Sequence, residues 1–247
     1  MKLLLMADGA VGEEIFRWLL DSFLEDLVAV VVTAENTILH DAKKRSVPVC
    51  VYESSAQVCH WLSSNSITAD YGLLAWWPKI IRMPLLLSAQ NGFVNTHPSL
   101  LPYNRGKHYN FWALVDESPF GVSLHLVNDG VDTGPIIAQR SIPYSWEDTG
   151  ETLYRRAMVE MVALFTEVYP QLRRGSVSAV PQDLNMGSYH HSSEIETASK
   201  INLEQNYRAR DLLNILRART FPGYPACSFY EHGQEYEVRI EIRKKSL

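Results

Sequence analysis

Two polar side chains lie two residues apart where an apolar run of the sequence ends. Asn95 and His97 belong to the segment GFVNTHP, and the loop SLLPYNRG follows. Residues i and i+2 of a strand point to the same face of its sheet, so both side chains would face one surface. An asparagine amide can donate to a developing oxyanion, and a histidine can move a proton near neutral pH. The pair therefore has the chemistry of a proton-transfer site with an oxyanion donor.

A carboxylate would complete such a site, and a short loop downstream offers two. Asp129 and Asp132 lie in NDGVDT, between the apolar segments FGVSLHLV and GPIIAQRSIPY. These residue types also dominate ordinary turns, and a lone Asn or His at a strand end is more often a loop cap, so the site is a hypothesis. The EF-hand pattern is absent, and no second Cys or His cluster accompanies His190 and His191 at metal spacing, so no metal is expected.

The segments that must position these residues alternate between two patterns. Apolar runs predict strands at residues 2–7, 27–34, 47–52, 69–77 and 92–98, and helical spacing predicts helices at 10–24 and 56–64. Two further strands are expected at 120–127 and 134–144. The alternation predicts an α/β fold with a mostly parallel sheet flanked by helices. In such sheets ligands bind beyond the carboxyl ends of the strands, which is where Asn95 and His97 lie.

The second half of the chain has a different rhythm. A long helix is expected from about residue 151 to 174, with Pro170 kinking or ending it. Residues 175–203 are polar and predict a connector. A short helix at 208–219 and a β-hairpin at 226–242, with Gly233 in its turn, would form a small α/β tail. We therefore expect one domain over residues 1–175 and a second region over 176–247.

Composition limits the class of protein. The chain has 247 residues, 46% of them apolar, and a net charge of −5, which fits a globular domain and argues against a protein that coats nucleic acid. Its N-terminal apolar run is too short for a signal peptide, and no segment reaches the ~20 apolar residues of a membrane span. Cys50, Cys59 and Cys227 form no CxxC pair. Reduced thiols and a cytoplasmic location, without a membrane partner, are expected.

Longer segments around the polar residues resemble one known enzyme family. NTHPSLLPYNRG, FWALVDES and GVSLHLVNDGVDTGPIIAQ follow one another between residues 69 and 145. Together they resemble the formyltransferases that use 10-formyltetrahydrofolate, which include glycinamide ribonucleotide transformylase, methionyl-tRNA formyltransferase and sugar N-formyltransferases. The resemblance implies a Rossmann-like catalytic domain, in agreement with the strand and helix pattern.

The resemblance carries three catalytic roles over to matching positions of this chain. It implies direct transfer of a formyl group from the folate N10 to a substrate amine, without a covalent enzyme intermediate. His97 would accept or relay the amine proton, and Asn95 would donate to the tetrahedral oxyanion. Asp132 would orient His97 or a water and carry a proton toward the folate nitrogen.

The same resemblance implies where the folate binds. The pterin of the family lies between the exit of the fourth strand and the Asp132 loop. The corresponding residues here are Trp77, Pro78, Lys79, Ile80, Val127, Asp129 and Gly130. 10-Formyltetrahydrofolate is thus the expected co-substrate. Trp76 and Trp77 are equally well explained as core aromatics.

The acceptor amine distinguishes the branches of the family. The tRNA branch has a basic C-terminal domain, whereas residues 176–247 hold nine Lys and Arg against nine Asp and Glu. The glycinamide ribonucleotide branch is shorter and would leave the C-terminal hairpin unexplained. The loop LPYNRGKHYNFWAL and the terminal RTFPGYPACSFYEHGQEYEVRIEI are most similar to the sugar branch.

The sugar branch implies a nucleotide-linked amino-deoxysugar as acceptor, carried on dTDP or UDP, for bacterial surface polysaccharides such as the O-antigen of lipopolysaccharide. The expected substrate-binding residues are Asn104, Arg105, Gly106, Lys107, Asn110, Phe221 and Tyr224. Phe221 and Tyr224 would stack on the base, unless they form only a packed turn. A homodimer through the hairpin is also implied, with Phe229, Tyr230 and Tyr236 at its interface.

Other functions stay open. Methionyl-tRNA and glycinamide ribonucleotide remain alternative acceptors. A hydrolase would use the same three residues to release formate, although that relative usually carries a further N-terminal regulatory domain. A non-catalytic nucleotide-binding module would have no need to assemble Asn95, His97 and Asp132. The sequence does not distinguish an amine at carbon 3 from one at carbon 4.

Overall fold

The computed structural model describes residues 1–245 and divides them into two compact units. The sheet unit comprises Met1–His97, Ser123–Gln139 and Met158–Gln182. The C-terminal unit comprises Pro98–Val122, Arg140–Ala157 and the chain from Asp183 onward. Both units are discontinuous in sequence. The boundary after residue 175 therefore stays a prediction of domain organisation.

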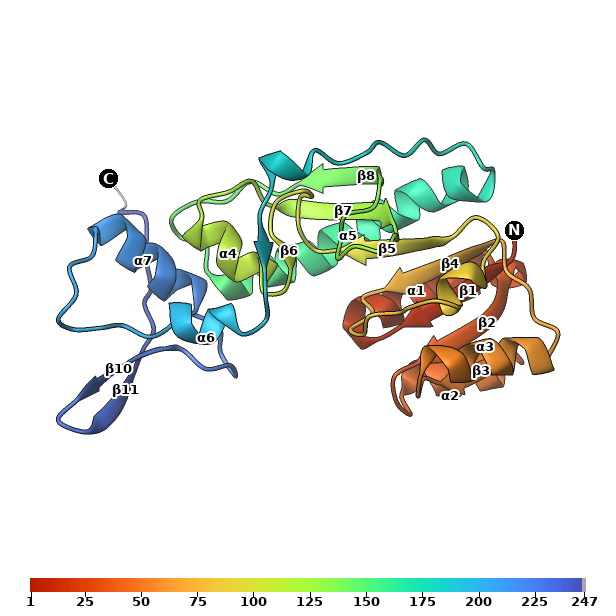
Figure 1. Cartoon of the computed structure of the whole chain (residues 1–247), viewed down its shortest axis with the longest axis horizontal. Coiled ribbons are helices and arrows are strands. Elements are labelled where there is room, and N and C mark those ends of the chain that lie inside the picture. The colour runs from red at the N-terminus through yellow and green to blue at the C-terminus, as the bar shows by residue number, and fades with distance from the viewer. Residues whose placement is uncertain (246–247) are drawn as a thin grey trace. The chain divides into compact units, whose positions relative to one another are not determined.

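A seven-stranded sheet forms the centre of the sheet unit, in the order β3-β2-β1-β4-β5-β7-β8 (Figure 1). Its first five strands in the chain pair in parallel, and β7 is antiparallel to β5. The strands are β1 Leu3–Ala7, β2 Leu27–Val32, β3 Val49–Val51, β4 Tyr71–Ala75, β5 Phe93–His97, β7 Gly121–Leu126 and β8 Ile136–Ser141. Every residue of β1 is buried, as expected for a central strand covered on both faces. The predicted Rossmann-like α/β fold is confirmed.

Helices α1 Gly9–Ser22, α2 Thr37–Lys44 and α3 Ser55–Ser64 connect the parallel strands. Each begins at a capping side chain that accepts a backbone N–H: Asp8, Asn36 and Ser54. The sequence pattern predicted no element at α2. That helix has only eight residues and buries just Ile38, Leu39 and Ala42, too few to give a clear helical repeat.

The long helix α5 covers Gly150–Arg173, close to the predicted range of 151–174. It runs through Pro170, so of the two predicted outcomes, a kink or an end, the helix does not end at this proline. The last turn is held from outside the helix. The Tyr169 hydroxyl donates to Asp26 Oδ2 at 2.9 Å, and Arg173 Nε donates to the same oxygen at 2.8 Å. Asp26 is buried, so these charge-assisted bonds help to offset the hydrogen bond that proline removes.

The C-terminal unit contains short elements. They are β6 Arg105–Gly106, α4 Tyr109–Val115, β9 Tyr189–His190, α6 Glu194–Ala198, α7 Ala209–Ala218, β10 Cys227–Glu231 and β11 Gln234–Val238. A short 3-10 helix at Leu184–Met186 also belongs to this unit, and two more lie in the sheet unit at Leu24–Asp26 and Leu85–Leu87. The predicted hairpin is confirmed as β10 and β11. Its turn holds His232 and Gly233, both with positive φ, which is typical of a type I′ turn.

The predicted connector is more structured than its polar composition suggested. Strand β9 pairs in parallel with β6, placing Tyr189 opposite Arg105 and His190 opposite Gly106. The His190 ring stacks on Trp112 at 4.0 Å between centroids and lies 3.0 Å from Asp116 Oδ2. Tertiary pairing, rather than a local apolar repeat, orders this segment. No helix within residues 1–245 is long and apolar enough to cross a membrane.

Candidate active site

Strand β5 places Asn95 and His97 on one face at its carboxyl end. His97 is 5% exposed, and Asn95 is half-buried. Thr96 points to the other face, where its hydroxyl donates to the carbonyl of Leu74 at 3.0 Å and accepts from the Trp76 N–H at 2.8 Å. These bonds tie the end of β5 to the end of β4. The two candidate catalytic side chains therefore stand on a rigid strand end.

His125, which the sequence analysis missed, lies on β7 directly opposite Asn95. Its Nδ1 lies 2.8 Å from the Leu126 carbonyl, which can only accept, so Nδ1 carries the hydrogen. In the neutral ring Nε2 then holds a lone pair, and Asn95 Nδ2 donates to it at 3.1 Å. This chain of bonds fixes both the tautomer of His125 and the orientation of the Asn95 amide.

The electrostatics keep His125 neutral. Burial lowers the pKa of His125 from its ordinary value to about 4, and the nearby His97 contributes to the lowering. Asp132 and the bond to Leu126 act in the opposite direction but do not reverse it. A neutral His125 at pH 7 is what the hydrogen bond from Asn95 requires. The signal in the sequence was a histidine at the end of a buried apolar strand, FGVSLHLV.

Asp132 completes the cluster from the loop between β7 and β8. Its Oδ1 lies 3.4 Å from His97 Nδ1, 3.5 Å from Asn95 Nδ2 and 3.7 Å from His125 Nε2. His97 Nδ1 and Asn95 Nδ2 can donate to this oxygen, whereas His125 Nε2 holds a lone pair and cannot; the carboxylate is 14% exposed. The structure brings the predicted trio Asn95, His97 and Asp132 together within the sheet unit.

The loop that carries Asp132 is internally braced. Asn128 Oδ1 accepts from the Gly130 N–H at 3.1 Å and from the Thr133 hydroxyl at 2.8 Å. Gly134 passes so close to the Leu126 carbonyl oxygen that an added Cβ would lie 1.7 Å from it. Asp132 itself has a φ of +53°, in the left-handed region. A tight loop therefore presents the carboxylate from a backbone conformation that few residues adopt freely.

The residues predicted to hold the folate lie in two segments of the sheet unit. Trp77 is half-buried and meets the Tyr52 ring edge-on at 5.3 Å, and Lys79 Nζ lies 5.2 Å from the centre of that ring. Trp77 and Val127 both pack against the same core cluster. Pro78, Ile80, Asp129 and Gly130 are exposed. Folate binding by these residues stays a prediction.

The residues predicted to hold the acceptor lie in the C-terminal unit, and several have structural partners there. Asn104 is fully buried, donates to Ser118 Oγ at 2.8 Å and accepts from Ser188 Oγ at 3.0 Å. Gly106 has a φ of +91°, and a Cβ there would lie 2.3 Å from the His190 carbonyl oxygen. These contacts explain both residue types by folding alone.

Their neighbours are more accessible. Lys107 is exposed, and Arg105 donates from Nε to the Ser188 carbonyl at 3.3 Å. Asn110 donates to the Gly150 carbonyl at 2.8 Å. Acceptor binding by Arg105, Lys107 and Asn110 stays a prediction.

Phe221 and Tyr224 form a small aromatic cluster in the C-terminal unit. Their ring centroids lie 4.6 Å apart, and Tyr154, which the sequence analysis did not single out, lies 5.5 Å from Phe221. Tyr224 is 59% exposed, whereas Phe221 is half-buried. One ring is therefore open to a stacking partner while the others support it.

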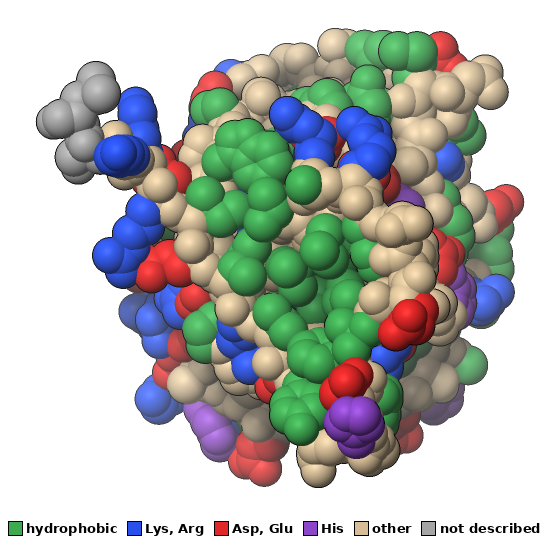
Figure 2. Space-filling model, turned by 90° about the vertical axis from the view of Figure 1, so that its left-hand side faces the viewer, with side chains coloured by type: hydrophobic (Ala, Val, Ile, Leu, Met, Phe, Trp, Pro, Cys, Tyr) green, Lys and Arg blue, Asp and Glu red, His purple; other side chains and the backbone are tan. Residues whose placement is uncertain are grey.

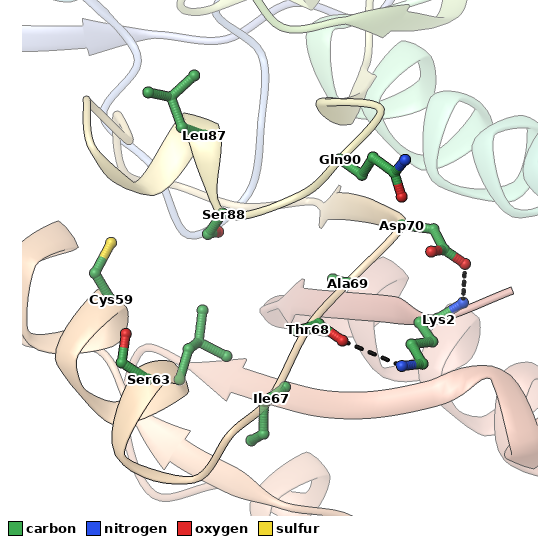
Figure 3. A pocket seen from close by; sticks show the side chains of 11 residues that line it. Lys2, Cys59, Ser63, Ile67, Thr68, Ala69, Asp70, Leu87, Ser88 and Gln90 are labelled. Atoms are coloured by element: carbon green, nitrogen blue, oxygen red, sulfur yellow. Dashed lines mark hydrogen bonds between the residues drawn. The ribbon is translucent and has the colours of Figure 1, made fainter.

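A separate cavity of about 540 Å³ opens at the other edge of the sheet, among residues that precede β1 and β4 (Figure 3). Lys2 Nζ donates to Thr68 Oγ1 at 3.1 Å, and the Lys2 backbone N–H donates to Asp70 Oδ2 at 2.7 Å. The cavity is also lined by Cys59, Ser63 and other side chains. It lies at the amino ends of the strands and contains none of the predicted site residues. Over residues 1–245 no group of three His, Cys, Asp or Glu side chains is placed to hold a metal ion.

Known proteins resemble this chain in sequence and in fold. Residues 22–169 match the family described as formyl transferase, and residues 194–244 match the N-formyltransferase dimerization C-terminal domain. The methionyl-tRNA formyltransferase of Thermodesulfovibrio yellowstonii is 29% identical over 198 residues, 79% of this chain and 62% of that protein. The chain therefore spans less than two thirds of that curated relative.

Solved structures show the same fold. A sugar N-formyltransferase from Shewanella has a TM-score of 0.81 at 19% identity, with 100% of this chain and 99% of that chain covered. The formyltransferase PseJ of Anoxybacillus kamchatkensis, in complex with UDP-4,6-dideoxy-4-formamido-L-AltNAc and tetrahydrofolate, has a TM-score of 0.57 at 26% identity, covering 87% and 97%. The match to the formyl transferase family extends over residues 22–169, more than half of the chain, so the chain belongs to this family.

Proposed function

We propose that this chain is an N-formyltransferase that moves the formyl group of 10-formyltetrahydrofolate to the amine of a nucleotide-linked amino-deoxysugar. The observation that carries the proposal is the buried cluster in which Asp132 Oδ1 lies within 3.5 Å of both His97 and Asn95. Such a cluster combines an oxyanion donor, a proton carrier and a carboxylate. The chain belongs to the formyl transferase family, and formyl transfer to an amine would use all three groups.

In the proposed reaction the acceptor amine attacks the formyl carbon. A bond forms between that carbon and the amine nitrogen, and the bond from the carbon to the folate N10 breaks. One proton leaves the amine and one reaches N10. His97 takes the amine proton, and Asp132 keeps the His97 ring oriented through Nδ1. Asn95 Nδ2 donates to His125 Nε2 at 3.1 Å and lies 3.5 Å from Asp132 Oδ1, so the amide hydrogen on the Asp132 side is the one that would turn to the oxyanion.

For the folate, Trp77 and Val127 offer an apolar surface in the same unit as the catalytic cluster, and Lys79 adds a cation. Pro78, Ile80, Asp129 and Gly130 are the exposed residues of the same two segments. The tetrahydrofolate bound to PseJ supports the choice of co-substrate, because that protein shares the fold at 26% identity. The folate supplies the formyl group and leaves with a proton on N10.

For the acceptor, the sugar reading is supported by the formamido sugar nucleotide on PseJ and by the domain matched at residues 194–244. Residues 176–247 carry nine basic and nine acidic side chains, which suits a small ligand better than a tRNA backbone. We assign Tyr224 and Phe221 to the base, with Tyr154 behind them. Arg105 and Lys107 are the cations proposed for the pyrophosphate. The formylated product would serve surface-polysaccharide synthesis.

We also propose that the chain forms a homodimer through its C-terminal hairpin. Phe229 and Tyr236 stack across β10 and β11 at 5.3 Å, and Tyr230 is 59% exposed. Figure 2 shows hydrophobic side chains gathered on the side of the molecule that lies at the left of Figure 1, where β10 and β11 are drawn. Light scattering should give the mass of two chains, and Tyr230→Asp with Tyr236→Asp should give one. A wild-type monomer at micromolar concentration would refute the dimer.

The function is tested by incubating the protein with 10-formyltetrahydrofolate and a panel of acceptors, followed by mass spectrometry of the products. The panel contains dTDP- and UDP-linked sugars with amines at carbon 3 or carbon 4, glycinamide ribonucleotide and methionyl-tRNA. A formylated nucleotide sugar that is absent with Asp132→Asn supports the proposal. Product with only glycinamide ribonucleotide or methionyl-tRNA, or formate released without any acceptor, would overturn the sugar assignment in favour of the corresponding alternative.

A further inference from the structure

Gln182 joins the loop of Asp132 from a distant part of the sequence. Its side-chain amide Nε2 lies 2.9 Å from the carbonyl oxygen of Asp132 and 2.6 Å from that of Gly134. All three residues belong to the sheet unit. The two carbonyl groups flank Thr133, so one amide group spans the backbone of the loop immediately after the carboxylate residue.

The identity of this side chain follows from its acceptors. Carbonyl oxygens only accept hydrogen bonds, so the group between them must donate twice. A primary amide has two N–H hydrogens on one nitrogen and meets this need without a charge. A carboxylate would oppose both oxygens, and a methyl group would leave two carbonyls without this donor. The contacts therefore also fix which end of the Gln182 amide is nitrogen.

The segment that carries Gln182 is anchored independently. Val180 and Ile136 exchange two backbone hydrogen bonds, both of 2.8 Å. Ile136 begins β8, the last strand in the order of the sheet, so residues 180–182 lie along an otherwise open edge. This backbone pairing delivers the Gln182 side chain to a defined position relative to the loop.

The loop has a reason to need such a brace. Asp132 has a φ of +53°, in the left-handed region, which Asp adopts more readily than most non-glycine residues but less readily than glycine. A change of backbone conformation at Asp132 would redirect the carboxylate. Asn128 braces the first half of the loop through Gly130 and Thr133, and Gln182 braces the second half.

We propose that Gln182 is a positioning residue of the active site: it holds the backbone of Asp132 so that its carboxylate faces His97 and Asn95. The inference rests on the proposed function, because the cluster is assigned there to formyl transfer. Gln182 does not enter the chemistry in this scheme. It acts only through the orientation of Asp132.

The test is a double-mutant cycle measured by formyl transfer under saturating co-substrates. Gln182→Ala should lower kcat about 100-fold with KM nearly unchanged, the size expected for a misplacement of about 1 Å. In an Asp132→Asn background the same substitution should cost less than about threefold, because the group that it positions is already lost. Gln171→Ala, an exposed glutamine on α5, is the matched control and should behave as wild type. Equal losses in both backgrounds would overturn the proposal.

A second variant and a second measurement test the proposal even if Gln182→Ala fails to fold or the wild type shows no turnover. Gln182→Glu should regain part of its activity relative to wild type as pH falls, because the protonated carboxyl can donate to one of the two carbonyls and the facing oxygens raise its pKa. Amide hydrogen exchange over residues 128–134 should accelerate in Gln182→Ala and not in Gln171→Ala. Unchanged exchange refutes the brace, even if the wild type proves to formylate no acceptor. An inactive wild type with accelerated loop exchange refutes the proposed function instead.

Discussion

The carboxyl ends of the parallel strands (the carboxyl edge) and their amino ends (the amino edge) both carry Lys, Asp, Ser or His side chains. These side chains are largely buried at the carboxyl edge and open to solvent at the amino edge. At the amino edge Lys2 and Asp70 form solvent-exposed hydrogen bonds around the cavity of Figure 3. At the carboxyl edge His97, His125 and Asp132 are largely buried, and Asp132 Oδ1 lies 3.4 Å from His97 and 3.7 Å from His125. The cavity of Figure 3 thus lies where the polar groups are open to water. The proposed chemistry lies where burial makes each contact strong and each charge sensitive to its neighbours.

The largest effect is expected for Asp132→Asn at the carboxyl edge, when it is compared with Asp70→Asn at the amino edge. Asp132→Asn removes the charge that orients His97, so kcat should fall ~10²–10⁴-fold, the range for a lost acid–base group. Asp70→Asn, at the amino edge, should leave kcat within about twofold, since surface polar pairs contribute little. Product mass with the best acceptor of the panel measures both. Comparable losses for the two variants would show that the two edges do not differ as argued.

His125 sharpens the comparison because it is polar, buried and close to the proposed chemistry without taking part in it. His125→Phe removes the acceptor for Asn95 but keeps a ring of similar size. We expect kcat to fall ~10–10²-fold and the free energy of unfolding to fall by ~1–3 kcal/mol, because the Asn95 N–H loses its buried partner.

The control for this substitution is His60→Phe on α3, where the histidine is exposed. It should change neither quantity. An unchanged kcat in His125→Phe would show that Asn95 does not need a fixed amide orientation.

The pH dependence of stability should come from the carboxyl edge. The folded pKa of His125, about 4, lies below the ordinary value of 6.5, so the unfolded chain binds the proton first as pH falls. Between pH 6.5 and 4 the protein should therefore lose up to roughly 3 kcal/mol of unfolding free energy on account of this one group. Urea denaturation at pH 7 and pH 5 measures the change. His125→Gln should show a smaller loss over this interval, and an equal loss would assign the effect to other groups.

The smallest effect is expected at the amino edge. Lys2→Met removes the bond to Thr68 but keeps the backbone bond to Asp70, so the free energy of unfolding should change by less than about 1 kcal/mol. Thermal melts at low and high salt check this value. A larger loss that disappears in high salt would reveal a stronger ionic network at this edge than the exposed pair provides.

Much of the fold could be predicted because it depends on patterns of residues that are close together in the sequence. The apolar runs of β1, β2 and β5, the alternation with helices and the glycine turn of the hairpin all depend on neighbouring residues. The sequence did not show what distant residues decide. Asp26 holds the end of α5 beyond Pro170, and β6 orders the segment that composition marked as a connector. Helix α2 was too short for its pattern to be visible.

The sequence by itself determined the residue types at the end of β5 and in the Asp132 loop, and their order along the chain. This was enough to recognise the enzyme family and to pick out Asn95, His97 and Asp132. Only the tertiary structure decided that His125 orients Asn95 and that Gln182 grips the loop of Asp132, since these partners lie 30 and 50 residues apart. Hydrogen bonds depend on distance and angle in space. No spacing along a chain reports them until the register of β5 against β7 and the path of residues 180–182 are known.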